Sequence, residues 1–131
     1  MGNDNPVNLK YSKEHEWADI SLGSIVTIGI TLHAQEALGD IVFLELPAVG
    51  KVVKQGDTIG VVESIKAVSD IYSPVTGKIS EVHSSLVSEP GKINTDPYKE
   101  GWLVKVEVSD RSTLDGLLDS EQYFKFVSSL K

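Results

Sequence analysis

The residues that could do chemistry in this chain are lysine, histidine and the carboxylic acids, because its 131 residues include no cysteine. Disulfides and thiolate metal sites are thereby excluded, so any redox chemistry must come from a group added to the chain. Lys66 is the candidate for such an addition. It lies between two strand-like segments, 58–63 and 68–72, that predict a hairpin with Lys66 in its turn. A rigid turn would hold the amine where an acylating enzyme can reach it; the alternative is a lysine that only solvates the turn.

No motif of an autonomous active site accompanies this lysine. The three histidines, His15, His33 and His83, lack the His-Glu-x-x-His spacing of a zinc site. Ser64 and Lys66 are one residue too close for the Ser-x-x-Lys catalytic pattern. Residues 56–60 lack the glycine spacing and the Lys-Ser/Thr ending of a phosphate-binding loop. We therefore expect neither a catalytic residue nor a metal site.

The charge of the chain limits its partners. Nineteen acidic residues against 12 basic ones give a formal net charge of −7, which argues against nucleic-acid binding. An acidic surface suits docking to basic protein partners, and good solvation alone is the competing explanation. No apolar stretch has membrane-spanning length, and residues 1–9 lack the features of a signal peptide or transit segment. We expect an intracellular soluble protein, or an organellar one whose targeting segment is missing.

Short β-rich segments separated by glycine and proline must position Lys66. Besides the hairpin, the composition predicts strands at 25–30, 40–46 and 78–82, and a short one between the glycines of 49–57. Thr31 is expected to cap a short helix that ends at Gly39. Gly29 is expected at a bulge, and Pro47 ends the strand before it.

The second half of the chain predicts a loop, a strand and helices. Residues 84–101 are rich in Pro, Gly, Asn and Asp and predict a loop. Residues 102–108 alternate apolar and polar side chains as a half-buried strand does. Leucines and aromatic residues from Leu114 to Leu130 follow helical spacing, with Ser120 as the expected cap of the last helix. These helices are expected to pack against the sheet.

A short internal echo joins two of these segments. Residues 47–52 and 74–79 share the pattern Pro-x-x-Gly-Lys followed by a β-branched residue. The echo suggests two copies of one β unit related by an approximate two-fold axis; common turn chemistry is the other explanation.

The run from Val61 to Gly77, which surrounds Lys66, is the most specific part of the sequence. Other distinctive segments precede and follow it: 14–17, 29–31, 34–35, 38–43, 45–47, Asn94, 96–98, 100–102 and 117–118. Together these segments resemble those of the glycine cleavage system H proteins and follow one another in the same order. The resemblance covers roughly residues 8–127. Ala18 stands where the family often has Val, and Lys92 where an apolar residue is commoner.

The resemblance implies a mainly β fold, a lipoyl/biotinyl-type hybrid barrel-sandwich of two antiparallel sheets. Short helices, including a C-terminal one, would flank the sheets in a single domain over residues 1–131. It also implies that lipoate is joined to Lys66 through an amide. The lipoyl arm would then supply the sulfur chemistry that a chain without cysteine lacks.

The implied function is that of a swinging-arm carrier in glycine catabolism and one-carbon metabolism. A pyridoxal-phosphate glycine decarboxylase would load an aminomethyl group on lipoyl-Lys66, and a tetrahydrofolate-dependent aminomethyltransferase would remove it. A dihydrolipoyl dehydrogenase with FAD and NAD would reoxidise the arm, and a lipoate ligase or lipoyl transferase would attach it. The difficult chemistry belongs to those enzymes and their cofactors. The carrier is expected to be a monomer in the bacterial cytoplasm or the mitochondrial matrix.

The resemblance also implies roles for residues near the arm. Glu63, Ser64 and Ala67 would be read by the lipoylating enzyme, and Asp70 is a further candidate for that role. Glu14, Glu16 and Asp70 would contact the loaded arm, where a carboxylate can pair with its amine. The competing interpretation is that these carboxylates are solvated turn or strand residues. Trp17 and Trp102 are expected in the core.

Four other functions compete with this one. Biotin carriers have Met on both sides of the lysine, where this chain has Ile65 and Ala67. Lipoyl domains of 2-oxo acid dehydrogenases usually have Asp before the lysine and Pro/Ala-rich linkers, and neither is present here. A lipoate relay protein, which donates lipoyl groups to 2-oxo acid dehydrogenase complexes, stays open. So does a β-rich interaction module with an unmodified Lys66.

Overall fold

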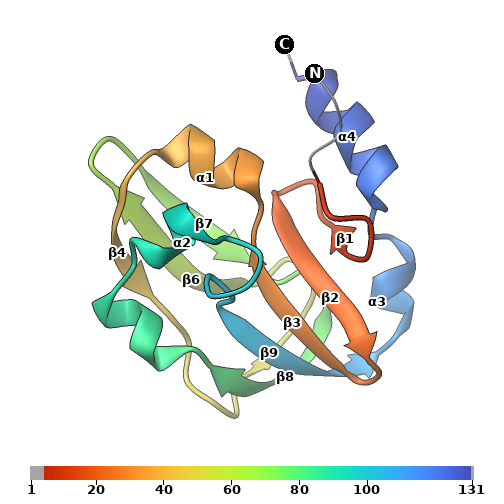
Figure 1. Ribbon diagram of the computed structural model, residues 1–131. Coiled ribbons are helices and arrows are strands. Elements are labelled where there is room, and N and C mark those ends of the chain that lie inside the picture. Colours follow the sequence, from red (N-terminus) through yellow and green to blue (C-terminus); the bar gives the residue numbers. More distant parts are fainter. Residues whose placement is uncertain (1–4, 131) are drawn as a thin grey trace.

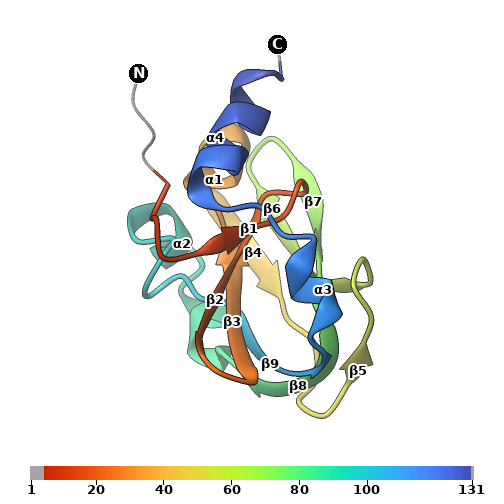
Figure 2. The ribbon, with the colours of Figure 1, turned by 90° about the vertical axis from the view of Figure 1, so that its right-hand side faces the viewer.

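The computed structural model describes residues 5–130, and its strands form two antiparallel sheets (Figures 1 and 2). The larger sheet has the strand order β1-β2-β3-β9-β8-β5, and the smaller one has the order β4-β6-β7. The strands are β1 (Lys10–Tyr11), β2 (Glu16–Leu22), β3 (Ile25–Ile30), β4 (Ile41–Glu45), β5 (Val52–Val53), β6 (Thr58–Ser64), β7 (Val68–Tyr72), β8 (Thr76–Val82) and β9 (Val104–Asp110). The predicted class, mainly β with two antiparallel sheets, is confirmed.

Short helices flank these sheets. They are α1 (Leu32–Leu38), the 3-10 helix η1 (Ser84–Ser88), α2 (Lys92–Thr95), α3 (Ser112–Asp115) and α4 (Ser120–Ser128). The start of α1 is as predicted, because the Thr31 hydroxyl accepts a hydrogen bond from the backbone N–H of Ala34. The predicted cap of α4 was wrong. Asp119, not Ser120, caps it, because its carboxylate accepts from the N–H of Gln122 while the Gln122 side chain accepts from the Asp119 N–H.

The hydrophobic core lies mainly between the two sheets. Strand residues from both sheets, such as Ile28, Leu44 and Ile79, are at most 1% exposed. A second cluster of Leu9, Tyr11, Trp17 and Tyr123 joins the N-terminal strands to α4. Burial of these apolar surfaces supplies the main driving force for folding. Trp17 is 2% exposed and belongs to the core, as predicted. Trp102 is only half-buried, so it belongs to the core in part: it packs against the second cluster and stacks on His83.

Gly29 does not form the predicted bulge. It pairs directly with Trp17 in the β2–β3 ladder, whose register shift lies at the other end, between Asp19 and Leu22. A Cβ on Gly29 would lie 2.5 Å from the Trp17 indole, so glycine makes room for that ring. The strand β2 was not predicted at all, because buried Glu16 and half-buried Asp19 interrupt the apolar alternation.

Two further segments differ from expectation. The predicted loop at 84–101 contains η1 and α2, which are too short for hydrophobic periodicity to reveal. The last strand begins at Val104 rather than at residue 102 and continues to Asp110. The two copies of the internal echo pair with each other, with Val52 opposite Lys78 in the antiparallel ladder of β5 and β8. This pairing is what a local two-fold axis between the copies produces.

Candidate functional site

Lys66 lies in the tight turn between β6 and β7, and the backbone of this turn is held by Ser64. The N–H of Ser64 donates to the carbonyl of Ala67 over 2.8 Å. The Ser64 hydroxyl accepts from the N–H groups of Lys66 and Ala67, at 3.3 and 3.1 Å. Ser64 is 8% exposed, while Ile65 and Lys66 project into solvent. The Ser64 hydroxyl also donates to the Ala67 carbonyl over 3.4 Å. The predicted hairpin therefore exists, and four hydrogen bonds within residues 64–67 hold the turn that presents the Lys66 amine.

The end of α1 borders the Lys66 side chain. A Cβ added to Gly39 would lie 3.6 Å from Cε of Lys66, so the lysine stem passes close to this glycine. Gly39 ends α1 with a φ of +82°, a conformation that favours glycine. Figure 1 shows α1 between the end of β3 and the hairpin of β6 and β7. Sequence reasoning used Gly39 only as a helix terminator and missed this contact.

Glu16 is buried in the structure and joins the two sheets. It is 2% exposed, and its carboxylate accepts from the Ser12 hydroxyl and, at 3.2 Å, from the N–H of Tyr72 at the end of β7. Burial raises the pKa of Glu16 to about 7, although both hydrogen bonds favour the carboxylate form and oppose that shift. Nothing in the sequence near Ser12 pointed to this partnership.

The other predicted carboxylates are exposed. Glu14 lies in the turn before β2, two residues from Glu16. Asp70 lies on β7, between the Lys66 turn and Tyr72. From the Lys66 turn, β7 leads to Asp70 and then to Tyr72, whose N–H contacts Glu16. The strand is about 13 Å long.

Glu63 and Ala67 flank the turn. Glu63 is the residue before Ser64 on β6 and pairs with Val68 on β7. Ala67 closes the turn through its carbonyl and N–H. The three residues predicted to be read by a lipoylating enzyme, Glu63, Ser64 and Ala67, are therefore gathered at the base of the Lys66 side chain.

Two histidines meet near the beginning of α1. The rings of His15 and His33 have centroids 4.5 Å apart, and His15 has a φ of +70°. The Tyr123 hydroxyl of α4 lies 2.7 Å from Nδ1 of His15 and 2.8 Å from the hydroxyl of Thr31. Burial, and then the neighbouring His33, lower the pKa of His15. Sequence reasoning treated the histidines only as metal ligands, and spacing alone could not show that two of them touch.

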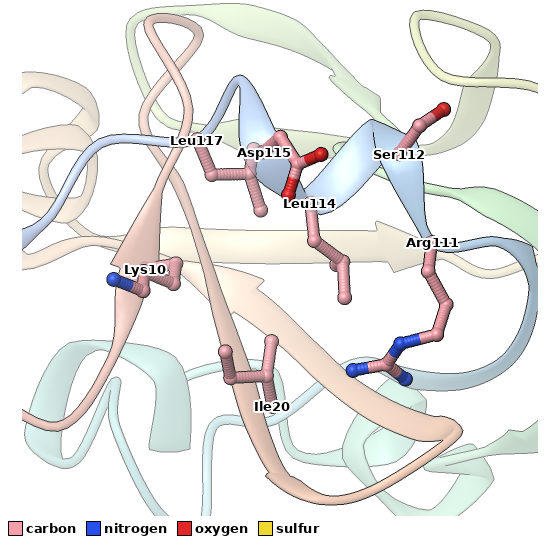
Figure 3. A pocket seen from close by; sticks show the side chains of 7 residues that line it. All are labelled: Lys10, Ile20, Arg111, Ser112, Leu114, Asp115 and Leu117. Carbon is pink, nitrogen blue, oxygen red and sulfur yellow. The ribbon is translucent and has the colours of Figure 1, made fainter.

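A separate hollow of about 530 Å³ lies between β1, β2 and α3 (Figure 3). Apolar side chains of Ile20, Leu114 and Leu117 form its middle, with Lys10 and Arg111 on opposite sides. The hairpin of Lys66 lies at the other side of the molecule in Figure 1. None of the residues predicted for the arm lines this hollow, so it is no part of the Lys66 site.

Residues 5–130 contain neither a metal-binding cluster nor a membrane-spanning helix. No group of three or more His, Asp or Glu in this part of the chain is arranged to hold a metal ion. None of its helices has the length and apolar character needed to cross a membrane.

Comparison with known proteins assigns the family. The family model described as Glycine cleavage H-protein matches residues 9–130. The chain is 50% identical to the glycine cleavage system H protein of Myxococcus xanthus over 94% of its own length and 95% of that protein. It is 57% identical to that of Teredinibacter turnerae, over 91% and 92% of the two chains. With the mitochondrial H protein 2 of Arabidopsis thaliana it shares 52% identity over 91% and 76%.

A solved structure agrees with these matches. The fold is similar to the crystal structure of a glycine cleavage system H protein from Mycobacterium marinum, with a TM-score of 0.83. The two chains are 41% identical, and the similarity covers 95% of this chain and 99% of the other. The residue-level resemblance seen around Lys66 thus extends over both sequence and fold, and the chain belongs to the glycine cleavage H-protein family.

Proposed function

We propose that Lys66 is the lipoyl attachment site and that the chain carries aminomethyl groups on this arm between enzymes of glycine cleavage. Membership of the family supports a lipoyl carrier role in glycine cleavage. The observation that carries the residue assignment is the Lys66 turn, where an exposed amine stands on a backbone that Ser64 holds by hydrogen bonds.

The residues around Lys66 suit a lipoyl group. The lysine amine is exposed, and no salt bridge or side-chain hydrogen bond within residues 5–130 occupies it. The Lys66 side chain is bordered on one side by the end of α1, because it passes close to Gly39. A lipoyl group attached to the Lys66 amine can extend along either α1 or β7. Along β7 it would pass Asp70 on the way to Glu16.

This chain's own residues would place and shield the arm. A bound lipoyl group supplies a dithiolane, which accepts the aminomethyl group and electrons. Ser64 fixes the direction in which Lys66 leaves the turn. Glu14 and Asp70, both exposed, offer carboxylates to the cationic amine of the load. Glu16 is buried, so its contribution is to hold the end of β7 and the turn of Glu14 together.

We propose that the chain has no catalytic residue of its own and works as a monomer with four partners. These are the glycine decarboxylase, the aminomethyltransferase, the dihydrolipoyl dehydrogenase and the enzyme that attaches lipoate. A carrier that visits several active sites needs its arm accessible from solvent, as Lys66 is. Its compartment would be the one that holds those enzymes, the bacterial cytoplasm or the mitochondrial matrix.

Mass spectrometry tests the attachment site. The chain is co-expressed with a lipoate ligase in the presence of lipoate, next to a Lys66→Arg variant that keeps the charge but cannot form the amide. We expect one lipoyl addition, confined to the peptide that contains Lys66 and absent from the variant. An unmodified wild-type chain, under conditions that load a known lipoyl domain, would refute the proposal.

A second assay addresses what the arm does. Lipoylated protein is combined with the three glycine cleavage enzymes, and release of CO2 from labelled glycine is measured. We expect turnover with the wild type and none with Lys66→Arg. If the lipoylated protein fails here but transfers its lipoyl group to a 2-oxo acid dehydrogenase domain, a relay function replaces the carrier function.

A further inference from the structure

The outer face of the three-stranded sheet has an ordered pattern of side chains beside Lys66. The register places Phe43 opposite Glu63 and Glu63 opposite Val68, in one row across β4, β6 and β7. The next row on the same face consists of Glu45, Val61 and Asp70. Each row is thus a mixture of apolar and acidic side chains, and the first row lies next to the turn that carries Lys66.

Two of the three apolar members of this face, Phe43 and Val68, are exposed, while Val61 is half-buried. Phe43 is 44% exposed and Val68 is 67% exposed, and Ile65 in the adjacent turn is 79% exposed. Neighbouring strands are about 4.8 Å apart, so Phe43 and Val68 on the outer strands span about 10 Å. Gathered apolar groups with a polar surround are typical of interaction sites rather than of isolated exposed residues.

The acidic members lack partners of opposite charge. None of Glu45, Glu63 and Asp70 forms a salt bridge or a side-chain hydrogen bond within residues 5–130. Lys66 is the cation nearest to them in the sequence of the hairpin, and acylation removes its charge. A basic partner surface is what complements such a face.

The enzyme that acylates Lys66 must come closer to this face than any other partner. The amide bond forms at Nζ, at the end of the lysine's own four-carbon stem. Enzymes that act on the far end of a completed arm need no such approach. The acylating enzyme must therefore contact the residues that border the turn.

We propose that the outer face of β4, β6 and β7 is the docking surface of the lipoate-attaching enzyme, which presents an apolar centre flanked by Lys or Arg. The proposal rests on acylation of Lys66 and adds Phe43, Glu45 and Val68 to the residues recognised. Apolar contact supplies the buried centre of this interface, and the carboxylates accelerate and orient the encounter.

Charge variants with a matched control test the acidic part. The triple variant Glu45→Gln, Glu63→Gln, Asp70→Asn changes the formal net charge from −7 to −4. The control Glu107→Gln, Asp115→Asn, Glu121→Gln makes the same change with exposed residues of β9, α3 and α4. Initial rates of lipoylation by a purified lipoate ligase with lipoate and ATP are measured at low and high ionic strength.

We expect the face variant to lose roughly tenfold or more in kcat/KM at low salt, with a weaker salt dependence than the wild type. The control is expected to keep its kcat/KM within about twofold, because its charges lie away from the encounter surface. Equal losses in both triples would show a net-charge effect and would overturn the proposal, as would unchanged rates in both.

An apolar pair tests the centre of the face. Val68→Ser removes an apolar side chain that is 67% exposed, and Val52→Ser removes one that is 71% exposed on β5. We expect KM to rise about fivefold or more only for Val68→Ser, since only its side chain enters the interface. Equal KM values for the two variants would overturn the apolar part.

The final extent of lipoylation in the same reaction distinguishes failure of the docking proposal from failure of the lipoylation proposal on which it rests. Wild-type protein that gains no lipoyl group with excess ligase refutes lipoylation itself, and docking with it. Full modification of the wild type, with equal rates for every variant, refutes the docking surface alone. Circular dichroism of all variants checks that the folded state is kept.

Discussion

The carboxylate of Glu16 accepts a hydrogen bond of 3.2 Å from the backbone N–H of Tyr72 and thereby joins the six-stranded sheet to the edge of the three-stranded sheet. The N–H of Tyr72 belongs to the last residue of β7, the strand that leaves the Lys66 turn. The buried side chain of Glu16 thus helps to fix the strand that follows the Lys66 turn. Because Glu16 is buried, its ionisation lowers the free energy of unfolding, and this effect depends on pH.

The first prediction concerns this pH dependence. Burial raises the pKa of Glu16 in the folded state to about 7 from an ordinary value of 4.5, so the folded protein binds more protons than the unfolded chain between these values. Stability from this group is therefore complete below pH 4.5 and is lost as the pH rises through about 7. The difference corresponds to on the order of 3 kcal/mol. Urea unfolding at pH 5 and pH 8 measures it.

The variant Glu16→Gln isolates this contribution. Its side chain keeps an acceptor for Tyr72 but cannot ionise, so it should lack the part of the pH dependence that comes from Glu16. His15 contributes in the opposite direction, because its lowered pKa makes stability fall at acidic pH. Comparison of wild type with variant removes that common term. Parallel stability curves for the two proteins would contradict the assignment, and exposed Glu107→Gln serves as the neutral control.

The second prediction concerns the Tyr123 hydroxyl. It bridges His15 and Thr31 and so connects α4 to the turn before β2 and to the start of α1. Tyr123→Phe keeps the ring stacked on Tyr11 but removes both hydrogen bonds, at an expected cost of about 1–2 kcal/mol in unfolding free energy. Tyr72→Phe is the matched control and should change stability by less than about 0.5 kcal/mol. Equal effects of the two substitutions would show that the bridge contributes nothing.

The hairpin at Lys66 was predictable, whereas its surroundings were not. Residues 58–63 and 68–72 have the β-branched composition of paired strands, and local pairing of adjacent segments follows from sequence order. The contacts of Gly39 with Lys66 and of Glu16 with Tyr72 join residues 27 and 56 positions apart. Such contacts depend on how the two sheets pack, which no local pattern encodes. Family resemblance pointed to Glu16 but not to its burial.

The same limit explains the structural errors. Gly29 in a strand is typical of a bulge or of a close approach by another group. Choosing between them requires knowing that the Trp17 indole lies over this glycine. The cap of α4 was misplaced by one residue because Asp119 and Ser120 are both good capping residues, and only the Gln122 pairing decides.

The third prediction follows from the contact at Gly29. Gly29→Ala would place a Cβ 2.5 Å from the Trp17 ring, and a buried indole has no free space into which to move. We expect a loss of about 1–3 kcal/mol in unfolding free energy from overpacking. Gly91→Ala is the control, because its φ is −62° and nothing lies within 4 Å of the added Cβ. Similar midpoints of urea unfolding for Gly29→Ala and Gly91→Ala would contradict the packing argument.

The fourth prediction tests whether rigidity of the turn matters for presentation of Lys66. Ser64→Ala removes the hydroxyl that accepts from the N–H groups of Lys66 and Ala67, but keeps the backbone bond between residues 64 and 67. We expect hydrogen exchange at these two amides to become roughly tenfold faster, since local opening loses two hydrogen bonds. The kcat/KM for lipoylation should fall about threefold to tenfold, because the amine spends less time in the geometry for attack. Ser69→Ala, on β7 nearby, removes a hydroxyl whose hydrogen bond is to the Asp70 carbonyl and should change neither quantity. Faster amide exchange with an unchanged lipoylation rate would show that the enzyme itself orders the turn, and that the hydrogen bonds of Ser64 serve the fold rather than the arm.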